Sequence, residues 1–171
     1  FLKTTAGTSI TSSEGLADVK RSLDNVQKTD PDNIVVSWIA DVDSSQLTQS
    51  DGYTSSSDWV IADRPWYKQL LKKQSVIITE PYQDTATKAW IVSVVAPVYQ
   101  SGTKTLLGAT GIDFDIKKLS TMVKSYKLGK TGFYMLATGD GKFIYHPDQA
   151  NNNKNVSESN MSKNIITAIQ N

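Results

Sequence analysis

Cysteine is absent from the 171 residues, histidine occurs once, and acidic and basic side chains nearly balance at 17 and 18. Without cysteine there can be no disulfide, no thiolate zinc site and no cysteine nucleophile. The basic residues are scattered and the net charge is +1, so no stripe could neutralise a phosphate backbone and we expect no nucleic-acid partner. The length is sufficient for one packed domain that buries roughly 70% of the surface of its unfolded chain.

Long hydrophobic runs are also missing. The longest apolar stretch, residues 89–99, is interrupted by Ser93 and Pro97 and is about half of the roughly 20 residues that a membrane-spanning helix needs. No signal-peptide pattern opens the chain. Its first residue is Phe1 rather than methionine, and we interpret this as a segment excised from a longer protein.

Three short patterns that could indicate a site are incomplete. Residues 129–131 (Gly-Lys-Thr) resemble the end of a phosphate-binding loop, but Lys124 stands where the first glycine is required. Residues 41–52 have the spacing of acidic residues found in calcium loops but lack the turn glycine and the bidentate glutamate. His146 has no acidic or hydroxyl neighbour at a spacing that indicates a triad, so we interpret it as structural. We therefore expect no cofactor and no metal.

The first 29 residues have the pattern of an amphipathic helix. Apolar side chains recur at spacings of three and four, and Pro31 ends the pattern. A capping box at residues 11–14 could begin this helix, but Leu2 and Ile10 favour a longer helix that starts upstream.

Strands are predicted where β-branched, apolar residues cluster. These runs are residues 34–40, 75–80, 89–99 and 104–114. Short polar links between the last three favour an antiparallel meander, and the polar stretch 41–57 is expected to be a loop or a short hairpin.

The last third of the chain begins with a predicted helix. Asp115 can cap a helix that reaches about Tyr126. The turn at residues 139–141 (Gly-Asp-Gly) predicts a second hairpin between residues 133–138 and 142–146.

One aromatic-rich segment has the chemistry of a carboxylate site. Pro65 keeps Arg64 out of the helical conformation and is itself favoured at a first helical position, so a helix is expected from here to about Lys73. The unpaired N–H groups at the start of that helix, the indole N–H of Trp66 and the Arg64 guanidinium could bind a carboxylate together. The alternative is that Trp59, Trp66 and Tyr67 are core aromatics and that Arg64 forms a surface ion pair.

Two aspartates are placed to complement that arginine. Tyr82 and Asp84 project to the same side of an extended chain, and Gly111 leaves room beside Asp113 on the next strand. Taken alone, each aspartate is better explained as a solvent-facing residue on an open sheet. Combined with Arg64, they provide donors for a carboxylate and acceptors for an ammonium, as a free α-amino acid requires within about 3 Å.

These pieces resemble the double Cache family, the extracytoplasmic sensor domain of bacterial and archaeal chemoreceptors and sensor kinases. The matching motifs are Arg64-Pro65-Trp66-Tyr67, Tyr82-Gln83-Asp84, Gly108-Ala109-Thr110-Gly111-Ile112-Asp113 and Gly129-Lys130-Thr131-Gly132-Phe133-Tyr134. The resemblance implies an α+β fold in which a long N-terminal helix precedes PAS-like antiparallel-sheet modules. It also implies a membrane-distal ligand-binding module at residues 1–125 and the incomplete beginning of a membrane-proximal module at residues 126–171.

The resemblance further implies a homodimer in the full receptor, together with transmembrane helices and a cytoplasmic signalling domain that this chain lacks. Within the family, the amino-acid-binding subset is similar at the pocket. Carried over by position, Arg64 and Trp66 would bind the ligand carboxylate, and Tyr82, Asp84 and Asp113 its ammonium. Trp59 stands where that subset commonly has tyrosine, and an indole donates one hydrogen bond but accepts none.

We therefore expect a non-catalytic, extracytoplasmic sensor of amino acids. Two alternatives remain: a Cache sensor for a small organic acid, and a protein-interaction module with a vestigial pocket. An enzyme is the least favoured class because no nucleophile, base and orienting group assemble from the sequence.

Overall fold

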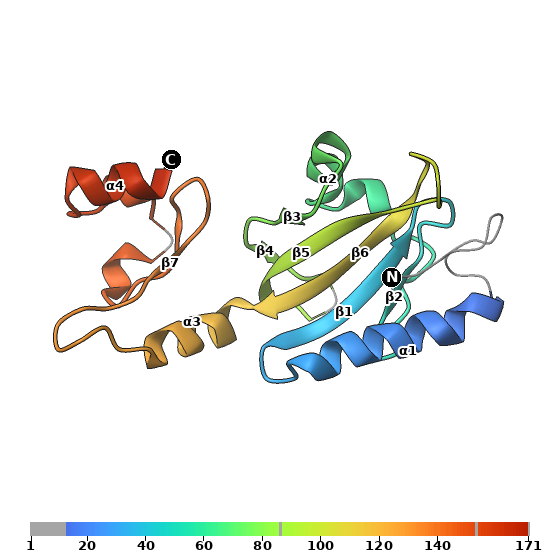
Figure 1. The fold of residues 1–171 in the computed structure, drawn as a ribbon, viewed down its shortest axis with the longest axis horizontal. Coiled ribbons are helices and arrows are strands. Elements are labelled where there is room, and N and C mark those ends of the chain that lie inside the picture. Colours follow the sequence, from blue (N-terminus) through green and yellow to red (C-terminus); the bar gives the residue numbers. More distant parts are fainter. Residues whose placement is uncertain (1–12, 86, 153, 171) are drawn as a thin grey trace. The chain divides into compact units, whose positions relative to one another are not determined.

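The chain folds into two units, and each combines helices with antiparallel strands (Figure 1). The computed structural model describes residues 13–85, 87–152 and 154–170. Contacts divide the chain into Phe1–Asp115 and Ile116–Asn171. The predicted α+β class with antiparallel sheets is therefore confirmed.

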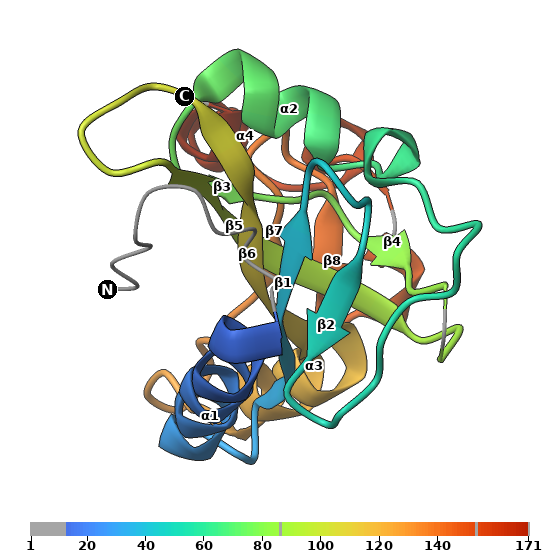
Figure 2. The same ribbon diagram turned by 90° about the vertical axis from the view of Figure 1, so that its right-hand side faces the viewer.

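Helix α1 (Ser13–Thr29) lies along β1 (Ile34–Asp41), on one face of the sheet (Figure 2). Its apolar stripe buries Val19 and Leu23 against Ile39, as the spacing of three and four residues predicts. The expected continuation of the helix toward Leu2 and Ile10 lies outside the described residues.

The sheet of the first unit is antiparallel throughout and has the order β2-β1-β6-β5-β3, with β4 also pairing β5. Its other strands are β2 (Leu47–Gln49), β3 (Ile77–Ile78), β4 (Tyr82–Gln83), β5 (Trp90–Tyr99) and β6 (Leu106–Asp115). The two long strands agree with prediction to within two residues. The predicted strand at 75–80 shortens to β3, and the polar stretch 41–57 contains β2, so it forms a short hairpin with β1.

The other face of the sheet is covered by η1 (Ile61–Asp63) and α2 (Tyr67–Lys73). Side chains from both segments pack in one buried cluster with side chains of β1, β3, β5 and β6. Helix α2 starts two residues after Pro65, later than expected, because Arg64 and Pro65 first form a turn in which the Tyr67 N–H donates to the Arg64 carbonyl at 3.0 Å. Two layers therefore enclose the sheet, with α1 on one side and η1 and α2 on the other.

The second unit is built from short elements. These are α3 (Ile116–Ser125), β7 (Leu136–Ala137), β8 (Phe143–Tyr145), η2 (Gln149–Asn151), η3 (Val156–Glu158) and α4 (Lys163–Gln170). The predicted hairpin is present, with Gly141 at φ +87° in its turn. His146 is buried and packs edge-on against Phe133 and Phe143, in agreement with a structural role.

The boundary between the units differs from the one expected at residues 125 and 126. Helix α3 packs on β8, so contacts group it with the second unit, ten residues earlier than expected. That residues 126–171 begin a membrane-proximal module remains a prediction. Among the described helices, none combines the length and the apolar character that crossing a bilayer requires.

Candidate functional site

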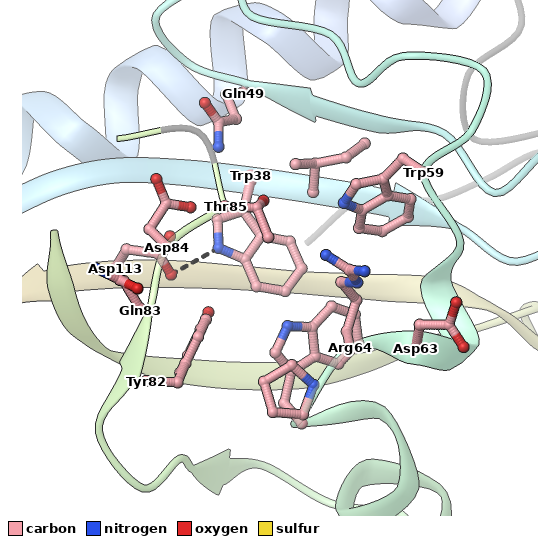
Figure 3. A pocket seen from close by; sticks show the side chains of 13 residues that line it. Trp38, Gln49, Trp59, Asp63, Arg64, Tyr82, Gln83, Asp84, Thr85 and Asp113 are labelled. Atoms are coloured by element: carbon pink, nitrogen blue, oxygen red, sulfur yellow. Dashed lines mark hydrogen bonds between the residues drawn. The ribbon is translucent and has the colours of Figure 1, made fainter. Parts of the chain in front are cut away.

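A pocket of about 240 Å³ opens in the first unit, on the face of the sheet that carries η1 and α2 (Figure 3). Its lining comes from β1, β2, β4, β6, the segment around η1 and the turn after β4. Side chains far apart in the sequence meet there. The lining includes all six predicted site residues, namely Trp59, Arg64, Trp66, Tyr82, Asp84 and Asp113.

Arg64 lies on one side of this pocket and Asp84 and Asp113 lie on the other, while a third lining carboxylate, that of Asp63, lies on the side of Arg64. Figure 3 shows the guanidinium of Arg64 beside Trp59 on one side and the carboxylates of Asp84 and Asp113 on the other. The hollow between them is therefore bordered by a cation at one end and by anions at the other.

Asp113 is the most deeply buried charged group of the pocket, with 4% of its surface exposed. Its Oδ1 accepts hydrogen bonds from Trp38 Nε1 at 2.7 Å and from Ser93 Oγ at 2.6 Å. Oδ2 accepts none from the described part of the chain. In the described part of the chain, every side-chain oxygen or nitrogen that is fully buried has a hydrogen-bond partner. Since Oδ2 of Asp113 has none there, it is not fully buried, and Asp113 lines the pocket.

Burial raises the pKa of Asp113 from 3.8 to about 6, although the hydrogen bonds from Ser93 and Trp38 act in the opposite direction. The neighbouring charge of Asp84 adds to the increase. A cation placed against Oδ2 would offset this cost, because an opposite charge favours the ionised carboxyl.

Tyr82 extends the same network. Its hydroxyl lies 2.8 Å from Ser93 Oγ, and since Ser93 uses its one proton toward Asp113, Tyr82 donates and Ser93 accepts. Burial raises the pKa of Tyr82, so this phenol remains a neutral donor. The chain of hydrogen bonds from Tyr82 through Ser93 to Asp113 fixes the carboxylate in place.

The indole of Trp38 fits over a glycine of the neighbouring strand. Trp38 on β1 is paired with Gly111 on β6. A Cβ at position 111 would lie 2.3 Å from Trp38 Cζ2, which no side chain tolerates. Gly111 therefore leaves the space predicted beside Asp113, and the Trp38 indole fills it.

The guanidinium of Arg64 lies 5.4 Å from the ring centroid of Trp59, at cation–π distance. Its Nε donates to the Val60 carbonyl at 3.2 Å. Within the described residues Arg64 has no ion pair, so the surface ion pair considered as the alternative is not formed. Its terminal nitrogens remain available to a ligand.

Trp66 is part of the core, with 3% of its surface exposed, and stacks on Trp38 with ring centroids 5.0 Å apart. It forms part of the pocket wall, but its packing is that of the core aromatic considered as the alternative. A hydrogen bond from its indole to a ligand remains a prediction.

Asp84 lies in the turn between β4 and β5. Its Oδ2 accepts hydrogen bonds from Thr87 N at 2.7 Å and Thr87 Oγ1 at 2.6 Å. This turn directs the side chain toward the pocket, on the side of Asp113 (Figure 3). Its role in binding an ammonium remains a prediction, as does the ligand role of every predicted residue.

Sequence reasoning missed several residues of the site. Trp38 and Ser93 lie in runs whose composition indicates only strands, and Gln49 lies in the polar stretch expected to be a loop or a short hairpin. A signal for Ser93 was present, since a polar residue interrupts an otherwise apolar strand. No sequence signal identifies Trp38, because its hydrogen-bond partner Asp113 lies 75 residues further along the chain.

A family model for the Cache domain, of the double Cache type, matches residues 6–170. The chain belongs to the double Cache family. Sequence relatives of this double Cache chain include the methyl-accepting chemotaxis protein PctB of Pseudomonas aeruginosa, which is 29% identical over 119 residues. That match covers 66% of this chain and 19% of PctB.

A solved structure with the same Cache fold is the ligand-binding domain of the Pseudomonas fluorescens chemoreceptor CtaA. In complex with L-isoleucine, that domain matches with a TM-score of 0.67 and 26% identity, over 88% of this chain and 60% of its own. In complex with L-serine, the CtaA domain matches with a TM-score of 0.68 and 25% identity, over 88% of this chain and 63% of its own. The chain thus spans about a fifth of PctB and about three-fifths of the solved CtaA domain.

Proposed function

We propose that this Cache chain is the ligand-binding part of a chemoreceptor and that its first unit binds a free α-amino acid. The observation that carries the proposal is the division of charge in the pocket: an arginine without an ion pair in the described chain faces two carboxylates, Asp84 and Asp113. A molecule with a carboxylate and an ammonium on the same carbon atom complements this arrangement.

The ligand carboxylate is bound by the terminal nitrogens of Arg64, whose two parallel donors match its two oxygens. Trp59 holds the guanidinium from one side by cation–π contact. The carboxylate is in this way positioned without a second positive charge.

The ligand ammonium is bound between Asp113 and Asp84, with Asp113 Oδ2 as its main acceptor. Trp38 and Ser93 hold the other oxygen of Asp113 and keep the carboxylate in one orientation. Each charge-assisted hydrogen bond contributes about 1.5 to 3 kcal/mol, so after ordering costs a micromolar dissociation constant is expected.

The comparisons support this ligand class. The CtaA domain, at 25 and 26% identity, is solved in complex with L-serine and with L-isoleucine. PctB carries the name of a methyl-accepting chemotaxis protein. By this likeness we extend the proposal to an extracytoplasmic, non-catalytic sensor that dimerises in its full receptor. Ligand binding then shifts the receptor between two conformations, which requires different affinities for the two.

The test is a thermal-shift screen of the purified chain, followed by calorimetry. L-α-amino acids should raise the melting temperature, whereas the matching decarboxylated amines and deaminated acids should not, because each lacks one of the two charges. Equal shifts from plain carboxylic acids would instead support an organic-acid sensor. Absence of any response, with a stable complex in pull-down, would support an interaction module with a vestigial pocket.

A further inference from the structure

A smaller hollow of about 50 Å³ adjoins the pocket. Gln49, Asp84 and Asp113 line both spaces. In Figure 3, Gln49 and Asp84 lie away from Arg64 and Trp59, on the side where the proposed ligand ammonium is bound. The two spaces therefore meet at Gln49, Asp84 and Asp113, and a substituent on the ligand's α-carbon would have to pass between Gln49 and Asp84 to reach the smaller hollow.

The smaller hollow has apolar walls and an acidic border. Its apolar lining comes from Val35, Val36 and Ile91, and a further carboxylate is supplied by Asp51. Asp51 is fixed in its turn, because its Oδ1 accepts a hydrogen bond from the Tyr53 N–H at 2.9 Å. An aliphatic chain that ends in a cation is the group that such a space complements.

The charges that line the two hollows also favour a ligand side chain that ends in a cation. Their combined lining contains one cation, Arg64, and four aspartates, which are Asp51, Asp63, Asp84 and Asp113. A zwitterion is neutral and leaves the excess of negative charge unchanged. Asp113, with 4% of its surface exposed and an Oδ2 without a partner in the described chain, borders both spaces and adds to this excess.

We propose that the amino acid bound by this pocket has a basic side chain, such as that of lysine, ornithine or arginine. Its stem lies along Val35, Val36 and Ile91, and its cation lies near Asp51 and Asp84. This inference rests on the proposed function, since it assumes that the main-chain carboxylate and ammonium are bound by Arg64 and Asp113. Acidic side chains are disfavoured by repulsion from the same carboxylates.

Calorimetry at pH 8 on the purified chain tests this with three ligands of similar length. L-lysine is compared with L-norleucine, which lacks only the terminal ammonium, and with L-glutamate. We expect L-lysine to bind about tenfold or more tightly than L-norleucine, and L-glutamate to bind more weakly than either.

Two variants locate the effect. Asp51→Asn keeps an acceptor for Tyr53 N–H but removes the charge, so it should reduce the preference for L-lysine to about threefold or less without changing the affinity for L-norleucine. Asp43→Asn removes an exposed carboxylate that lines neither hollow and should leave the preference unchanged.

The outcomes separate this inference from the proposed function. If L-norleucine and L-lysine bind equally, a basic ligand is excluded and amino-acid binding stands. If L-lysine binds more tightly but Asp51→Asn and Asp43→Asn have the same effect, the side-chain cation does not lie near Asp51, and its placement in the smaller hollow is wrong. If no amino acid binds to the folded wild-type chain, both proposals are wrong.

Discussion

Asp113 makes the folded chain less stable near neutral pH. Its pKa is about 6 in the folded chain against 3.8 without burial. Between these values the folded state keeps a proton that the unfolded state has lost, so the contribution of Asp113 to stability is most favourable below pH 3.8 and decreases as pH increases through 6. A difference of roughly 2 pKa units corresponds to about 3 kcal/mol above pH 6.

We therefore predict that Asp113→Asn stabilises the ligand-free chain at pH 8 by up to about 3 kcal/mol and that the gain disappears near pH 4. Asparagine keeps the oxygen that accepts from Trp38 and Ser93 and removes the buried charge. Thermal or urea unfolding of both proteins across this pH range measures the difference. A loss of stability at pH 8 would mean that the carboxylate is stabilised by partners outside these two bonds.

The same substitution, Asp113→Asn, should weaken the binding of the amino acid, because it removes the charge that pairs with the ligand ammonium. Leaving a ligand ammonium without its carboxylate in a closed site costs about 2 to 5 kcal/mol, so amino-acid binding should weaken by roughly 30-fold or more in calorimetry. A variant that is more stable and binds less tightly is the signature of a functional charge. Unchanged affinity at pH 8 would remove Asp113 from the binding site.

At the scale of elements, the site depends on how β1 and β6 are aligned. The pairing of Trp38 with Gly111 places the indole over the glycine and its N–H against Asp113. A slip of one residue would turn Asp113 to the face that α1 covers, because side chains alternate along a strand.

Gly111→Ala should therefore destabilise the chain by about 1 to 3 kcal/mol, because the new Cβ displaces the Trp38 indole. Gly139→Ala is the matched control, since its Cβ would meet no atom within 4 Å, and it should change stability by less than about 0.5 kcal/mol. Chemical unfolding gives both values. Equal effects of the two substitutions would mean that the indole moves aside without cost.

Elements differ in how far the sequence predicted them. Strands β5 and β6 were predictable because long apolar runs need no partner to be recognised, and Arg64 and Asp84 were found because their chemistry is unusual beside aromatics. Strand β4 has two residues and forms only through pairing with β5, and the same pairing limits the strand predicted at 75–80 to the two residues of β3. No local sequence pattern encodes such pairing. Trp38 and Ser93 are absent from the predicted site for the same reason, since their contacts with Asp113 are distant in the sequence.

At the scale of the whole molecule, the pocket belongs to one unit. All of its lining residues lie between Trp38 and Asp113, and contacts assign everything from Ile116 onward to the second unit. If the first unit folds alone, it should bind ligand alone. The boundary expected from sequence, after residue 125, and the boundary from contacts, after Asp115, differ by helix α3.

Two fragments test this independence, one that ends at Asp115 and one that ends at Ser125. Because the lining of the pocket ends at Asp113, we predict that both fragments fold and that both bind the same amino acid with an affinity within about threefold of that of the full chain. Circular dichroism verifies the folding and calorimetry measures the affinity. If only the longer fragment folds, α3 is required by the first unit, as the sequence suggested. If both fold and both bind at least tenfold more weakly, the second unit shapes the pocket, and the ligand's binding energy depends on both units.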